Sequence, residues 1–84
     1  MLTEYLVEMY LPAGNGGAGN DLDGRAEAAA LEVTDDARPI RFVRSIVLPS
    51  DESCLLLFAA ADSDLVAQAL GRAGLHPDRI VATG

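Results

Sequence analysis

Two groups of polar side chains interrupt the apolar strands of this sequence. Glu8 and Tyr10 alternate with apolar residues in the stretch TEYLVEMYL, so both lie on one face of a predicted strand. A carboxylate in the middle of a strand must be paired, protonated or bound to a ligand if that face becomes buried. Glu8 is therefore half of a structural ion pair with an arginine, a group that contacts a ligand or transfers a proton, or simply an exposed residue.

Arg41, Arg44 and Ser45 form the second group, in the stretch IRFVRSIVL. Strict alternation places Arg41 and Ser45 on one face and leaves Arg44 among the apolar residues of the other. Arg44 then lies either at the rim of the sheet or after a bulge that reverses the alternation. These residues either balance charge in an acidic protein or, with Glu8 and Tyr10, bind a ligand that carries an anionic group.

Cys54 and His76 are the single cysteine and the single histidine of the sequence. A lone cysteine excludes an internal disulfide, and the two residues offer too few soft ligands for a multi-cysteine or multi-histidine metal site within one chain. We expect Cys54 to be a buried, inert thiol at the start of a strand and His76 to lie in a solvated loop. We also expect them at opposite ends of the sheet, so any metal site that they form is weak.

The stretch GNGGAG, residues 14–19, matches the G-x-G-x-x-G spacing of dinucleotide-binding loops. That fingerprint requires a parallel strand after the helix, within a βαβ unit of about 30 residues. Here the next strand runs into a hairpin, the loop has no basic residue, and Asp21 and Asp23 would repel a phosphate. We interpret residues 13–20 as a flexible Gly-rich surface loop, with Asn20 or Asp21 as the N-cap of the helix that follows.

The remaining elements position these groups. Besides the first strand, strands are predicted at 40–48, 53–61 and 79–83, and helices at about 22–33 and 63–73. The order βαββαβ predicts an α+β, ferredoxin-like sandwich, in which two helices cover one face of a four-stranded antiparallel sheet. The other face carries Leu6, Tyr10 and apolar side chains of the third strand, and a single domain of 84 residues has nothing left to cover them. We therefore expect a homodimer.

Composition excludes some classes of partner. The net charge is −7 and the chain has no lysine, which disfavours nucleic acid because phosphate contacts need a basic surface. No apolar run approaches the roughly 20 residues of a membrane helix. Glu4 and Glu8 interrupt the first apolar stretch and no basic segment precedes it, so we expect a cytoplasmic protein without a membrane partner.

Three stretches carry a resemblance to a known family: YLVEMYLP at 5–12, RFVRSIVLPSDESCLLLFAA at 41–60 and LVAQALGRAGLHPDRIVA at 65–82. They resemble a family of small bacterial ferredoxin-like domains whose function is largely unassigned. One group in that family is described as nickel-binding and nickel-responsive, so the resemblance implies a homodimer and nickel as a cofactor. That group is rich in histidine; in this chain only His76 and Cys54 stand near comparable places.

Three functions are open at this point. The resemblance implies a dimeric binding protein that holds a metal ion or a small molecule at or between its sheets. The residues also suit a cofactor-free enzyme in which Glu8, Tyr10 and an arginine act on a small organic substrate in the cavity between two sheets. The third is a structural or regulatory interaction partner.

Overall fold

The structure, a computed structural model, describes residues 2–10 and 18–83 of the chain. Within these residues the elements are β1 (Thr3–Tyr10), α1 (Ala18–Val33), β2 (Ile40–Leu48), β3 (Ser53–Ala60), α2 (Ser63–Arg72) and β4 (Arg79–Ala82). A single 3-10 turn, Pro49–Asp51, joins β2 to β3. The order βαββαβ confirms the prediction, because the apolar periodicity of each segment was strong enough to fix its type.

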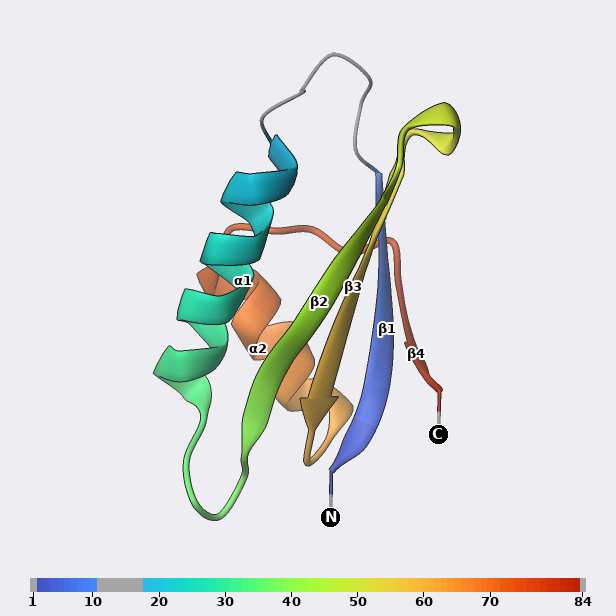
Figure 1. Ribbon diagram of the computed structural model, residues 1–84. Helices are drawn as coiled ribbons and strands as arrows, with labels where there is room; N and C mark the ends of the chain where they lie inside the picture. The colour runs from blue at the N-terminus through green and yellow to red at the C-terminus, as the bar shows by residue number, and fades with distance from the viewer. Residues whose placement is uncertain (1, 11–17, 84) are drawn as a thin grey trace.

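The described strands form one antiparallel sheet in the order β2-β3-β1-β4. Figure 1 shows α1 and α2 together on one side of this sheet, with β3 and β1 in its middle. This α+β arrangement is compatible with a ferredoxin-like fold. The almost wholly apolar strand β3 lies inside the sheet, between β2 and β1.

The core lies between the helices and one face of the sheet. Along β3, Cys54, Leu56 and Phe58 are fully buried under the helices, while Leu55 and Leu57 on the other face are only half-buried. The helices contribute small and branched side chains to the same core, among them Ala26, Ala29, Ala30, Leu65, Val66, Ala69 and Leu70. The alanines let α1 approach the sheet closely, and in the described residues the face opposite the helices carries no second layer.

Helix α1 begins earlier than the sequence indicates. It starts at Ala18, so residues 18–20 of the predicted loop are helical, and Asn20 and Asp21 lie inside the first turns instead of capping them. A carboxylate near a helix N-terminus interacts favourably with the helix dipole whether or not it caps the helix, so the presence of Asp21 did not fix the start. Gly14, Gly16 and the rest of residues 11–17 lie outside the described residues.

Helix α2 is closed at both ends by the predicted residues. The Asp62 side chain accepts a hydrogen bond from the Leu65 N–H at 3.0 Å and caps the N-terminus. At the C-terminus Gly74 takes the left-handed conformation, with φ of 72°, and the Leu75 N–H donates to the Leu70 carbonyl at 2.9 Å. Together with the bond from the Gly74 N–H this forms a Schellman motif that returns the chain towards β4.

A bulge in β2 decides the orientation of Arg44. Phe42 pairs with Phe58 and Arg44 pairs with Leu57, so Val43 is an extra residue in the ladder. The bulge reverses the alternation, as one of the two sequence interpretations proposed, and puts Arg41 and Arg44 on the same face, away from the helices. Without the bulge, a guanidinium would lie under the helices, where an unpaired charge is costly.

The ends of β3 and β4 correct one expectation. Both strands run antiparallel to β1, so they are parallel to each other and begin at the same end of the sheet. Cys54 pairs with Met9 and Arg79 pairs with the adjacent Glu8. The prediction that Cys54 and the loop containing His76 lie at opposite ends is therefore wrong.

In the described residues, no helix has both the length and the apolar character needed to cross a membrane.

Candidate functional site

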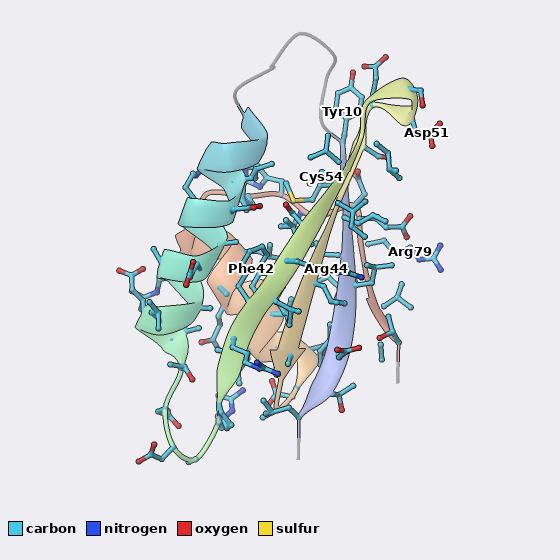
Figure 2. All side chains as sticks on the ribbon, in the orientation of Figure 1. Tyr10, Phe42, Arg44, Asp51, Cys54 and Arg79 are labelled. Atoms are coloured by element: carbon cyan, nitrogen blue, oxygen red, sulfur yellow. The ribbon has the colours of Figure 1, made fainter. Side chains whose placement is uncertain are left out.

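An open cleft of about 370 Å³ lies where β1 ends and where β3 and β4 begin. Its lining comes from three places: residues 8–10 at the end of β1, residues 51–53 at the β2–β3 turn, and residues 78 and 79 before and in β4. Figure 2 shows Tyr10 and Asp51 at the hairpin end of the sheet and Arg79 on the outer strand. The cleft forms because three chain segments meet at one end of the sheet.

Tyr10 and Glu52 form one pair in the cleft. The Tyr10 hydroxyl donates a hydrogen bond to Oε2 of Glu52 at 3.0 Å, and Glu52 takes the left-handed conformation, with φ of 51°. This hydrogen bond, the negative charge of Glu52 and partial desolvation raise the pKa of the Tyr10 hydroxyl. The phenol therefore stays protonated at neutral pH and acts as a donor, not as a base.

Glu8 and Arg79 form the other pair. Nε of Arg79 lies 3.4 Å from Oε2 of Glu8, and the two residues are also register partners in the β1–β4 ladder. An ion pair with an arginine is one of the alternatives that the sequence left open for Glu8, and the arginine comes from β4. The Glu8 side chain is 43% exposed, so solvent still reaches its carboxylate.

The cleft is acidic. Four carboxylates line it, from Glu8, Asp51, Glu52 and Asp78, against the single guanidinium of Arg79. Among the described residues, no side chain pairs with the carboxylate of Asp51 or Asp78. The lining thus attracts positive charge, and the exposed Tyr10 ring offers a flat apolar surface beside it.

The predicted ligand-binding group does not come together as one site. Glu8 and Tyr10 line the same cleft, but Arg41 and Arg44 lie on edge strand β2, two strands away from β1. Ser45 faces the helices, where its hydroxyl donates a hydrogen bond to Oδ1 of Asp23 in α1. The bulge at Val43 separates Ser45 from the arginines, which sequence alternation alone does not specify.

Cys54 and His76 provide no metal centre that the structure supports. Cys54 is fully buried on the helix side of the sheet, as expected, and burial together with the charge of Asp23 raises the pKa of its thiol. His76 is exposed in the loop after α2, also as expected. In residues 2–10 and 18–83, no three His, Cys, Asp or Glu side chains gather to hold a metal ion.

Sequence reasoning missed half of the cleft. Alternation singles out only Glu8 and Tyr10 of this lining; Asp51, Glu52 and Asp78 lie between the predicted helices and strands, and Arg79 starts the last predicted strand. The strand order could have indicated this part of the cleft. A strand that pairs antiparallel with β1 starts near the end of β1, and both β3 and β4 pair with β1 in this way. That rule brings the turn before β3 and the loop before β4 together at Tyr10.

Comparisons of the chain with protein-family models, with curated proteins and with solved structures found no match. The chemistry of the cleft therefore rests on its own residues.

Proposed function

We propose that this protein is a small-molecule-binding module that works as a homodimer and takes a positively charged organic ligand in the acidic cleft. The observation that carries the proposal is the imbalance of charge in the lining, where four carboxylates face one guanidinium. Asp51 and Asp78 have no partner among the described residues, so a cation would satisfy groups that are otherwise only solvated. Carboxylates that line one cleft favour a ligand of opposite charge.

The size and the shape of the cleft suit a small ligand. Its volume of about 370 Å³ falls at the lower end of the range for small-molecule sites, which is roughly 300–1,000 Å³. Tyr10 is 61% exposed, and an ammonium group placed over its ring would gain a cation–π contact. We infer an aliphatic amine or diamine as the ligand class.

Nickel is the ligand that the family resemblance implies, and it stays a separate hypothesis. Tight nickel binding favours several imidazole or thiolate donors, whereas the cleft offers carboxylates. We therefore expect nickel to bind more weakly than a diamine. A sub-micromolar nickel site that persists in the variant His76→Ala would contradict this expectation.

Calorimetric titration tests the proposal with three named probes: putrescine, nickel chloride and sodium acetate. We expect putrescine to bind and acetate not to bind. In the double variant Asp51→Asn/Asp78→Asn, the dissociation constant of putrescine should rise at least tenfold. The matched control is Glu27→Gln/Asp36→Asn, which removes the same charge from two exposed positions outside the cleft. Equal losses in both double variants would show that only net charge matters, and would overturn the site.

Native mass spectrometry of the purified protein tests the dimer and the ligand together. We expect a species near twice 8.8 kDa. A monomer at every concentration would reject the homodimer and would leave the cleft to be judged by the titrations.

A further inference from the structure

The face of the sheet opposite the helices has an apolar centre. Residues that pair directly across a ladder share a face. The registers therefore place on this face the side chains of Leu6, Ile46, Leu55, Leu57 and Val81. Ile46 is 40% exposed, and Leu6, Leu55 and Leu57 are half-buried. Five branched apolar side chains on one open face form a contiguous surface of the kind that protein contacts use.

Charges of opposite sign border this apolar centre on two different strands. Arg41 and Arg44 project from β2, while Glu4 and Glu8 project from β1. Strand β3 lies between β2 and β1, as Figure 1 shows, so the two charged rows are about 10 Å apart in one chain. No described residue forms an ion pair or a hydrogen bond with the side chain of Arg41, Arg44 or Glu4; the Thr83 hydroxyl donates to the Glu4 backbone carbonyl only.

The face also differs from the rest of the molecule in its charge. It carries three of the six arginines of the chain, because Arg79 joins Arg41 and Arg44, against two glutamates. The whole chain has a net charge of −7, so most of its surface would repel a second copy. Across its strands, away from the acidic cleft at one end, the open face therefore carries charges of both signs.

We propose that a second copy of this chain covers the open face about a two-fold axis that runs along β3. This arrangement lays β2 of each subunit over β1 of the other. Arg41 then faces the partner subunit's Glu4, because both belong to the row of Ala59. Arg44 reaches between the partner subunit's Glu4 and the partner subunit's Glu8, since its own row is that of Leu6, which lies between them.

The two-fold relation makes the surface self-complementary. The arginines on β2 of each subunit face the glutamates on β1 of the other subunit. The same set of contacts therefore occurs twice in the dimer, as an isologous interface requires. Leu55 and Leu57 lie on β3, next to the axis, and pack against their own copies. The aliphatic stem of Arg44 covers the partner subunit's Leu6, so the charged residues surround the apolar centre and shield it from water.

This inference rests on the homodimer of the proposed function and specifies its surface. The test uses sedimentation equilibrium on the full chain with two single charge reversals, Arg41→Glu and Glu4→Arg. Each reversal places like charges opposite each other twice, and we expect a dimer dissociation constant raised at least tenfold. Circular dichroism confirms that each variant is folded.

Two rescue experiments make the test specific. An equimolar mixture of Arg41→Glu and Glu4→Arg chains restores opposite charges at both contacts, so a heterodimer with nearly wild-type affinity is expected. The double variant Arg41→Glu/Glu4→Arg restores them in a homodimer. Arg72→Glu is the matched control, since it makes the same charge change on the exposed side of α2 and should leave the dimer intact.

The outcomes separate the two proposals. A wild-type dimer that neither reversal weakens beyond the Arg72→Glu control overturns the surface and leaves the homodimer standing. A wild-type chain that stays monomeric up to about millimolar concentration overturns both. Weakening by each reversal without rescue in the mixture also overturns the pairing of Arg41 with the partner subunit's Glu4.

Discussion

Glu8 and Arg79 meet both through their backbones and through their side chains. They are opposite each other in the β1–β4 ladder, and the Arg79 guanidinium lies 3.4 Å from the Glu8 carboxylate. This pair connects the shortest strand of the sheet to a central one and lines the acidic cleft. Side-chain exposures of 68% for Arg79 and 43% for Glu8 make it a solvated ion pair, not a buried one.

The exposure of this pair predicts a small effect on stability. Breaking a buried pair would cost about 3–5 kcal/mol, whereas an exposed pair contributes about 0–1 kcal/mol. We expect Arg79→Gln to lower the free energy of unfolding by less than about 1 kcal/mol in urea titrations. Arg72→Gln, at an exposed position of α2, is the control. A loss of several kcal/mol would mean that the pair is desolvated in solution.

Replacing either of two glycines by alanine should change the free energy of unfolding, and we expect the two changes to have opposite signs. Gly74 has φ of 72°, and a Cβ added there would lie 3.1 Å from Nη2 of Arg25, so Gly74→Ala should destabilise the protein by about 1–2 kcal/mol. Gly24 lies inside α1 with no atom within 4 Å of an added Cβ, so Gly24→Ala should stabilise it by up to about 1 kcal/mol. Thermal melts of the two variants should move in opposite directions; parallel shifts would contradict the assignment of Gly74 as the helix-terminating residue.

We expect the protein to lose stability in acid when the carboxylate of Asp62 becomes protonated. Hydrogen bonds from the Leu65 N–H and from the Arg38 guanidinium hold the pKa of Asp62 below its usual 3.8. Its contribution is therefore present above about pH 3.8 and is lost as the pH falls through the folded-state pKa. We expect the melting temperature of Asp62→Asn to fall below that of the wild type at pH 7 and to approach it at low pH.

The variant Asp62→Ala separates the cap from the ion pair. Alanine cannot accept the Leu65 N–H bond, so this variant should melt below Asp62→Asn at neutral and at acidic pH. If the two variants melt together, the cap contributes nothing measurable and the acid dependence comes from the ion pair with Arg38 alone.

The ionisation of the Tyr10 hydroxyl, followed by absorbance, reports on the cleft. The chain has only two tyrosines, so Tyr5→Phe leaves the absorbance titration of Tyr10 alone. Because its bond to Glu52 raises the pKa of Tyr10, the midpoint should lie above 10.0 and should fall in Tyr5→Phe/Glu52→Gln. The stability that this bond contributes is complete below pH 10.0 and is lost as the pH rises through the folded-state pKa. An unchanged midpoint after Glu52→Gln would show that the bond is absent in solution.

The elements of this fold could be predicted because their signals are local. The alternation along TEYLVEMYL, the apolar run of SCLLLFAA, the Asp62 cap and the Gly74–Leu75 stop each depend on residues within a few positions of one another. Such signals act over one strand or one turn and do not need the rest of the chain. An ion pair was one of the alternatives for Glu8 for the same kind of reason, since a carboxylate in mid-strand requires a partner if its face is buried.

The start of α1 and the orientation of Arg44 needed more than local pattern. A carboxylate suits the first turn of a helix as well as its cap, so Asp21 did not mark the boundary. A bulge at Val43 costs little by itself, and it is favoured here because it removes Arg44 from the core and brings Ser45 to Asp23.

The sequence by itself determined the order of elements, the two faces of β1 and the ends of α2, because these follow from short-range periodicity and capping. Tertiary structure alone decided that Glu8, Tyr10, Glu52 and Asp78 line one cleft and that Arg41 and Arg44 share the open face. The physical reason is that strand register joins residues tens of positions apart, and one extra residue in a ladder reverses every side chain beyond it.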